Sequence, residues 1–138
     1  MENRNILVDM FTNMVVKKNA DLIPKYYHPE FILYSNGDKM DYATFLSTHQ
    51  KIYATPIQYT IRYDVSTYVE QSDKIAARVF ITTTMPNEKA NEIEVILIAE
   101  YKDNKIYRLW ELTYPDWSKM EDFKPVTMGK QHYFKSVI

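Results

Sequence analysis

Glu111 and His49 are the two side chains in this sequence best suited to acid–base chemistry. Glu111 stands two residues after Leu109 and two before Thr113, so a strand would carry all three on one face. Burial in such a setting raises the pKa of a carboxyl group, which suits proton transfer near neutral pH. His49 lies on the apolar face of a predicted helix, where a neutral imidazole could move a proton.

The same two residues could have purely structural roles. Glu111 could instead be held by Arg108, Arg78 or Arg62, or simply be exposed, because structural ion pairs perturb carboxylates as readily as active sites do. His49 could be a hydrogen-bonded core residue, which is the more common role of a single histidine on an apolar face.

No metal or cofactor site is expected. The three histidines, His28, His49 and His132, have no metal-ligand spacing, and the chain contains no cysteine. Its only glycines are Gly37 and Gly129, so a glycine-rich nucleotide-binding loop cannot form. We therefore predict chemistry or binding that uses neither a metal nor a cofactor.

Charge and hydropathy restrict the partners. The formal net charge is -1, and 17 basic and 18 acidic residues are interspersed, which disfavours nucleic acid and anionic membrane surfaces. The longest apolar run, Val95 to Ala99, is far too short to span a membrane, and residues 1–5 lack a hydrophobic signal region. The absence of cysteine fits a reducing compartment, so we expect a cytoplasmic protein without membrane or nucleic-acid partners.

Helical spacing of apolar residues dominates the first third of the chain. It predicts helices over 2–18 and 20–27, and a third over Tyr42 to Tyr53 that Asp41 is placed to cap. A further short helix is expected over Asp116 to Phe123, whereas residues 126–138 have no clear periodicity.

Alternating apolar residues then predict strands. One short strand is expected over Glu30 to Asn36, and long strands over 57–65, 75–85 and the pair 92–114, which turns at Asp103 to Lys105. The alternation drifts between Ser66 and Val69, as a bulge would cause. Helices followed by a strand meander indicate an α+β domain with one sheet curled around its helices.

This order resembles the nuclear transport factor 2-like superfamily, particularly its SnoaL-like members. The segments that carry the resemblance are YYHPEFILYSNG, residues 26–37, and DNKIYRLWELTYPD, residues 103–116. It covers about residues 2–117, so we expect one SnoaL-like domain over 1–117 and an extension over 118–138. The resemblance implies a cone-shaped (cystatin-like) fold with a curved mixed or antiparallel sheet around N-terminal helices, an enclosed pocket, and often dimers through the sheet.

The best-understood chemistry of the superfamily does not carry over. Comparison with its steroid isomerases places their oxyanion-stabilising Tyr at Phe11, their general-base Asp at Ser35 and their protonated Asp at Ile96. Arg62 and Asp64 are only weakly similar to the proton relay of its epoxide hydrolases.

The comparison also implies which residues line the pocket. In addition to Glu111 and His49, they are Phe11, Phe31, Leu33, Ser35, Ile96, Leu109 and Thr113. Tyr107 would lie on the same face of its strand as Leu109 and Glu111. Trp110 and Leu112 would face the opposite side of the sheet, where a second copy of the chain would cover them and form a homodimer.

Two functions stay open on the residues alone. The first is a pocket for a small hydrophobic molecule, with Glu111 and His49 acting as a cofactor-free lyase, isomerase or hydrolase. The second is a non-catalytic ligand carrier or protein-interaction module with the same fold, because proton-transfer catalysis usually needs an acid, a base and an orienting group.

Overall fold

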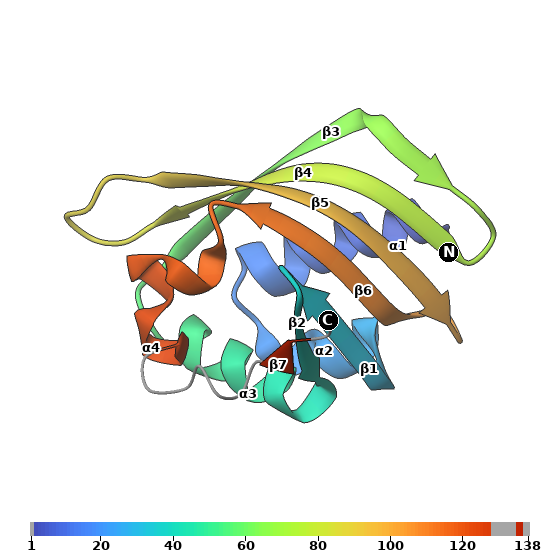
Figure 1. The fold of residues 1–138 in the computed structure, drawn as a ribbon, viewed down its shortest axis with the longest axis horizontal. Coiled ribbons are helices and arrows are strands. Elements are labelled where there is room, and N and C mark those ends of the chain that lie inside the picture. Colours follow the sequence, from blue (N-terminus) through green and yellow to red (C-terminus); the bar gives the residue numbers. More distant parts are fainter. Residues whose placement is uncertain (1, 128–134, 137–138) are drawn as a thin grey trace.

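A strongly curved sheet wraps around the N-terminal helices (Figure 1). The computed structural model describes residues 2–127 and 135–136, and within them the sheet has the order β3-β4-β5-β6-β1-β2-β7. Its strands are β1 (Tyr27–Ser35), β2 (Asp38–Asp41), β3 (Gln58–Glu70), β4 (Lys74–Thr84), β5 (Asn91–Lys102), β6 (Lys105–Tyr114) and β7 (Lys135–Ser136). The α+β class and the curved mixed sheet predicted from the sequence are confirmed.

The long strands β3 to β6 form the predicted meander of antiparallel neighbours. The β5–β6 turn is the predicted one, with Asp103 and Asn104 at φ of 55° and 60°, a conformation that asparagine and aspartate tolerate best among residues with a Cβ. The predicted drift on the first long strand is a register shift between Asp64 and Val69. A bulge of this kind increases local twist and helps the sheet to curl.

The first predicted helix is divided into two forms. α1 (Asn3–Met10) is α-helical and continues as a π-helical segment, Phe11–Val16. Both parts bury one face against the sheet, namely Ile6, Leu7, Met10, Phe11, Met14 and Val15. Together they occupy the concave side of the sheet (Figure 1).

The remaining helices are short apart from α3. The predicted helix over 20–27 is a 3-10 turn, Ala20–Leu22, followed by α2 (Ile23–Tyr26). α3 (Tyr42–Tyr53) has the predicted bounds, and the backbone N–H of Thr44 donates to Asp41 Oδ1 at 2.9 Å, which is the expected N-cap.

β1 is longer than predicted, and it pairs with the last long strand. It starts at Tyr27 and runs parallel to β6, with Ser35 paired to Glu111. The Asn36-Gly37 turn then returns the chain into β2, which the sequence did not predict because four residues show too little alternation. This pairing brings the first third of the chain against the last long strand.

The segment after β6 crosses one end of the cone. The predicted helix over Asp116 to Phe123 is instead two 3-10 turns, Trp117–Lys119 and Glu121–Phe123, followed by α4 (Lys124–Thr127). Buried Asp122 accepts a hydrogen bond from Thr83 Oγ1 at 2.6 Å, which fastens this segment to the end of β4. Within the extension expected over 118–138, residues 128–134 and 137–138 lie outside the described part. No helix among the described residues is long and apolar enough to cross a membrane.

Candidate functional site

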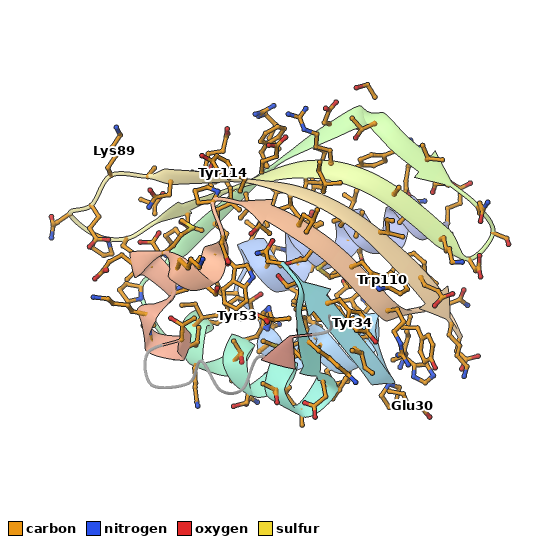
Figure 2. The ribbon with its side chains drawn as sticks, in the orientation of Figure 1. Glu30, Tyr34, Tyr53, Lys89, Trp110 and Tyr114 are labelled. Atoms are coloured by element: carbon orange, nitrogen blue, oxygen red, sulfur yellow. The ribbon has the colours of Figure 1, made fainter. Side chains whose placement is uncertain are left out.

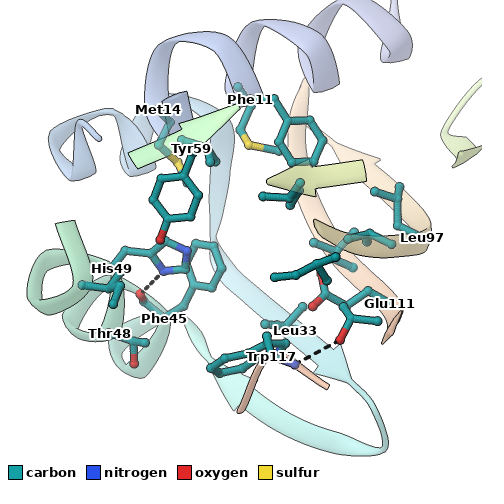
Figure 3. Close-up of a pocket in the computed structure, with 18 of the residues that line it drawn as sticks. Phe11, Met14, Leu33, Phe45, Thr48, His49, Tyr59, Leu97, Glu111 and Trp117 are labelled. Carbon is teal, nitrogen blue, oxygen red and sulfur yellow. Dashed lines mark hydrogen bonds between the residues drawn. The ribbon is translucent and has the colours of Figure 1, made fainter. Parts of the chain in front are cut away.

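A cavity of about 150 Å³ lies between the concave face of the sheet, the first helix, α3 and the C-terminal segment (Figure 3). Its walls are mainly aliphatic and aromatic, with a few polar groups. The lining residues are Leu7, Met10, Phe11, Met14, Val15, Tyr27, Leu33, Met40, Phe45, Thr48, His49, Ile52, Tyr53, Tyr59, Ile81, Ile93, Val95, Leu97, Leu109, Glu111, Thr113, Trp117, Phe123 and Val126.

Glu111 presents the carboxyl group in this cavity. It stands on β6 between Leu97 of β5 and Ser35 of β1, and strand neighbours share a face of the sheet. Its Oε2 accepts a hydrogen bond from Ser35 Oγ at 2.8 Å. Burial raises the pKa of Glu111, and the hydrogen bond from Ser35 opposes part of that rise. No arginine pairs with it among the described residues, so it is a desolvated acid rather than half of an ion pair.

His49 lies across the cavity from Glu111 (Figure 3). Its Nδ1 is 2.7 Å from the carbonyl oxygen of Phe45, and a carbonyl only accepts, so Nδ1 carries the proton. Burial lowers the pKa of His49 to about 4, while the Phe45 hydrogen bond opposes the shift. The imidazole is therefore neutral at neutral pH, with the Nε2 lone pair as its acceptor.

Three tyrosines line the cavity as well. Burial raises the pKa of Tyr27, Tyr53 and Tyr59, so all three hydroxyls are neutral donors and acceptors at neutral pH. The Tyr53 and Tyr59 rings meet edge to face with centroids 6.0 Å apart. The Tyr53 hydroxyl is buried and has no hydrogen-bond partner in the described part of the chain. Figure 2 shows Tyr53 inside the fold, between α3 and the sheet.

Of the residues predicted to line the pocket, Phe11, Leu33, Leu109 and Thr113 do so together with Glu111 and His49. Ser35 does not line the cavity itself; it is buried and contacts it through Glu111. Phe31 is buried in the core, where its ring packs against Tyr27 and Phe45 with centroids 4.7 and 4.8 Å away.

The prediction for Ile96 is wrong. Its side chain is 53% exposed, because Ile96 pairs with Leu112 and opposed residues of antiparallel strands share one face. Val95 and Leu97 line the cavity instead, so the comparison was displaced by one residue on β5, which moves a side chain to the other face.

Tyr107 and the Arg62–Asp64 pair also lie away from the cavity. A register shift in β6 puts Ile106 in the core, while the Tyr107 ring packs against His28 and Arg108. The Arg62 side chain is mostly exposed and pairs with Glu92, and Asp64 pairs with Arg78. These contacts leave no epoxide-hydrolase-like relay at this position.

Sequence reasoning missed several lining residues. Tyr59 shows the alternation of a half-buried strand, but nothing in this pattern separates a pocket from a core. Trp117, Phe123 and Val126 follow β6, and the short helix predicted over Asp116 to Phe123 does not indicate that the chain folds back over the cavity. Thr48 and Tyr53 lie on α3 near His49, so helical spacing alone could have added them.

The described lining of the cavity carries no basic side chain apart from His49. None of its described lining residues is a lysine or an arginine, so Glu111 and the neutral His49 are its acid–base groups besides the tyrosines. Within residues 2–127 and 135–136, no group of three histidine, aspartate or glutamate side chains could hold a metal ion.

Comparison with solved structures shows the fold. The chain matches PrhC from Penicillium brasilianum with a TM-score of 0.71 and 14% identity, over 98% of this chain and 100% of that one. It matches a SnoaL-like polyketide cyclase from Agrobacterium tumefaciens with a TM-score of 0.63 and 16% identity, over 82% and 92%. An LEH-like epoxide hydrolase from M. tuberculosis matches with a TM-score of 0.65 and 9% identity, over 80% and 83%.

These likenesses confirm the nuclear transport factor 2-like, SnoaL-like resemblance at the level of the fold. No family model matches the sequence, and no curated protein matches it either. At such low identity a shared fold does not carry a shared reaction, so the function has to be argued from the cavity.

Proposed function

We propose that the cavity binds a small, uncharged and mainly hydrophobic molecule carrying a hydroxyl or carbonyl group, and that Glu111 exchanges a proton with it. The reaction class is a cofactor-free lyase, isomerase or hydrolase. The observation that carries the proposal is a carboxyl group whose pKa is raised by desolvation in an apolar cavity, where no described lining residue is a lysine or an arginine.

The volume limits the size of the ligand. An apolar cavity of about 150 Å³ is large enough for benzene, and this cavity has about that volume. A single ring or a short branched chain fits, whereas a polycyclic molecule needs the walls to move. The aromatic lining provides flat apolar surface for such a ring.

The charge of the lining limits the ligand further. A carboxylate or phosphate ligand would lose its hydration on entering the cavity, and no lysine or arginine among the described lining residues would compensate its charge. A hydroxyl or carbonyl group can instead bond with neutral partners, namely the Tyr53 or Tyr59 hydroxyl, His49 Nε2 or the Glu111 carboxyl. An uncharged ligand with one such group meets both conditions.

The two titratable groups have different roles in this proposal. Glu111 donates or removes the proton, because a raised pKa keeps its two forms closer in population at neutral pH. His49, with a pKa of about 4, is a weak base and accepts a hydrogen bond through Nε2, which orients the ligand. A polyketide cyclase and an epoxide hydrolase among the structures of this fold support an enzyme, though only by analogy.

Matched probes test the ligand class. Benzyl alcohol, benzaldehyde, benzoate and benzylamine share one ring and differ in charge and polar group, and calorimetry or ligand-observed NMR measures their binding. Benzyl alcohol or benzaldehyde should bind most tightly, and both Glu111→Gln and His49→Ala should weaken binding more than they change stability. Tight binding of benzoate, or binding that both variants leave intact, would contradict the proposal.

The second candidate is a ligand carrier without turnover. It is favoured by the Tyr53 hydroxyl, which has no partner among the described residues, and by the single carboxyl group in the described cavity lining, since catalysis usually needs a base, an acid and an orienting group. A carrier would bind the probes reversibly at all pH values with no product. An enzyme would convert a small cyclic ketone, epoxide or alcohol with a pH profile that disappears in Glu111→Gln.

The outer face of the sheet supports the proposal of a homodimer. Trp110 and Leu112, 38% and 66% exposed, lie beside further exposed apolar residues on β5 and β6, namely Ile96, Ile98 and Tyr114. Apolar patches of this kind on a protein surface mark interaction sites. A second copy of the chain, meeting the first face to face, is the proposed occupant. The cytoplasm stays the proposed location, because a chain without cysteine fits a reducing compartment.

A further inference from the structure

Two residues from distant parts of the chain lead to the Glu111 carboxyl group through consecutive hydrogen bonds. Ser35, at the end of β1, donates to Glu111 Oε2 at 2.8 Å. Trp117, in the segment after β6, donates from its indole Nε1 to Ser35 Oγ at 2.9 Å. Trp117 and Glu111 lie on the same side of the cavity (Figure 3), so these bonds form a short chain of donors that ends at the carboxyl group.

The direction of this chain follows from its first member. An indole N–H can only donate, so the Ser35 oxygen accepts from Trp117. The single hydroxyl hydrogen of Ser35 is then available for Glu111, and Oε2 is the acceptor whether the carboxyl group is ionised or neutral. Because hydrogen bonds in series polarise one another, the indole strengthens the bond that Ser35 donates.

The two carboxyl oxygens of Glu111 differ in their hydrogen bonds. Oε2 is occupied as an acceptor, while no hydrogen bond from a described residue reaches Oε1. We infer that Ser35 and Trp117 are positioning residues that fix the orientation of the Glu111 carboxyl group and make Oε1 the oxygen that gives and receives the proton in the cavity. The neutral acid carries its proton on Oε1, and transfer to a ligand oxygen leaves a carboxylate whose Oε2 charge Ser35 stabilises. The ligand-facing part of this inference rests on the proposed function, whereas the hydrogen-bond chain does not.

The same contacts make the C-terminal segment a part of the site. Besides Trp117, this segment supplies Phe123 and Val126 to the cavity wall. Asn36 bonds through Nδ2 to Asp116 Oδ1 at 3.2 Å, and Asp122 bonds to Thr83, so the segment is fastened on both sides of the cavity. The indole donor to Ser35, which bonds to Glu111, is therefore in place only when residues 115–127 are docked.

The two tryptophans of the chain, Trp110 and Trp117, offer a direct test in the apo protein. Each gives one indole N–H signal in a proton–nitrogen NMR spectrum. The Trp117 signal should shift with pH at the same midpoint as the Glu111 carboxyl carbon, which is assigned by its loss in Glu111→Gln. The Trp110 signal, from the outer face of the sheet, should not follow that midpoint. The other titratable groups among the described lining residues are His49, across from Glu111, and the tyrosines Tyr27, Tyr53 and Tyr59, of which Tyr27 interacts electrostatically with Glu111. Their own midpoints are followed in the same spectra.

Variants separate positioning from general stability. Ser35→Ala should raise the Glu111 pKa, because it removes a hydrogen bond to the charged form, and should uncouple the Trp117 signal from that titration. Trp117→Phe should raise it in the same direction by a smaller amount. Trp110→Phe and the exposed Ser72→Ala are the matched controls, and both should leave the Glu111 midpoint unchanged.

A Trp117 signal that stays constant through the Glu111 titration would overturn the inference, as would an unchanged Glu111 midpoint in Ser35→Ala. If a variant does not fold, the wild-type indole titration decides alone. Because no ligand is added, the result is independent of the probe experiment. Failure of all probes with a coupled indole signal would reject the proposed function and keep the hydrogen-bond chain.

Discussion

The Trp110 and Tyr34 rings are stacked on the outer face of the sheet, 5.8 Å apart between centroids and within 7° of parallel. They stand on the paired strands β6 and β1, and Figure 2 labels both along these strands, with Tyr114 at the end of β6. The stack continues the exposed apolar residues of β5 and β6, so together they form one apolar surface on the outer face of the sheet. Such a surface suits burial against another copy of itself.

We expect Trp110→Asp to produce a monomer. The substitution puts a charge at the centre of the apolar surface, where a desolvated carboxylate without a partner opposes association. Light scattering at high micromolar protein measures the effect. Val69→Asp is the control, because Val69 is 66% exposed on β3, the edge strand at the far end of the sheet. A wild-type chain that is already monomeric at this concentration would contradict the proposed dimer.

Glu111→Gln should stabilise the protein at neutral pH. The Glu111 pKa is raised by burial, so the folded state binds its proton more tightly than the unfolded state. Stability from this group is therefore present below the unfolded pKa and lost as pH rises through the folded pKa. The loss is about 1.4 kcal/mol for each pH unit that separates the two pKa values. Denaturant titrations should show that the free energy of unfolding of the variant rises relative to that of wild type as pH increases. Equal stability of both proteins from pH 3 to pH 8 would contradict a buried acid.

His49→Gln should reduce sensitivity to acid. The folded pKa of His49 is about 4, against 6.5 as its ordinary value, so the unfolded state takes up the proton first. Its contribution is present above pH 6.5 and is lost as pH falls towards 4, to a limit of about 3 kcal/mol. The free energy of unfolding of wild type should fall in this window more steeply than that of the variant. At pH 8 the pH-dependent part of the difference should vanish, which separates titration from packing.

Tyr53→Phe should make the apo protein more stable and its ligand binding weaker. Among the residues that the structure describes, the buried Tyr53 hydroxyl has no hydrogen-bond partner, which costs about 1–3 kcal/mol that phenylalanine avoids. Tyr68→Phe is a matched control, because the Tyr68 hydroxyl is also buried and unpaired but does not line the cavity. Both variants should melt at higher temperature, and only Tyr53→Phe should lose affinity for benzyl alcohol. Loss of stability in Tyr53→Phe would mean that the hydroxyl has a partner in solution.

Local sequence patterns predicted most of the secondary structure, because helices and strands depend mainly on residues that are close together in the sequence. The bounds of α3 follow from the Asp41 cap and the Thr55-Pro56 stop, and the long strands follow from alternation. The parallel β1–β6 pairing brings together residues 76 positions apart at Ser35 and Glu111, and no local signal reports it. The wrong face for Ile96 has the same origin, since register on one strand depends on its neighbour.

The candidate site was only partly predictable for a related reason. Glu111 and His49 could be identified by residue type and face, and the structure places both at one cavity. The resemblance places Ser35 in the pocket, at the position of a catalytic Asp that this chain lacks, and no local pattern in the sequence reports its bond to Glu111. Trp117 follows the last strand, and its role depends on how the chain turns after Tyr114.

The long separation between Ser35 and Glu111 has a consequence for how the protein folds. The β3–β6 meander can form from neighbouring hairpins, whereas β1 must wait for β6, and non-local pairing of this kind is slow because loop closure precedes the contacts that stabilise it. Until β1 arrives, β6 is an open edge with an apolar outer face, and open edges template pairing between chains. Ser35 reaches Glu111 in the same step in which β1 pairs with β6 and covers this edge. A chain in which this hydrogen bond has formed therefore no longer offers β6 for pairing with another chain.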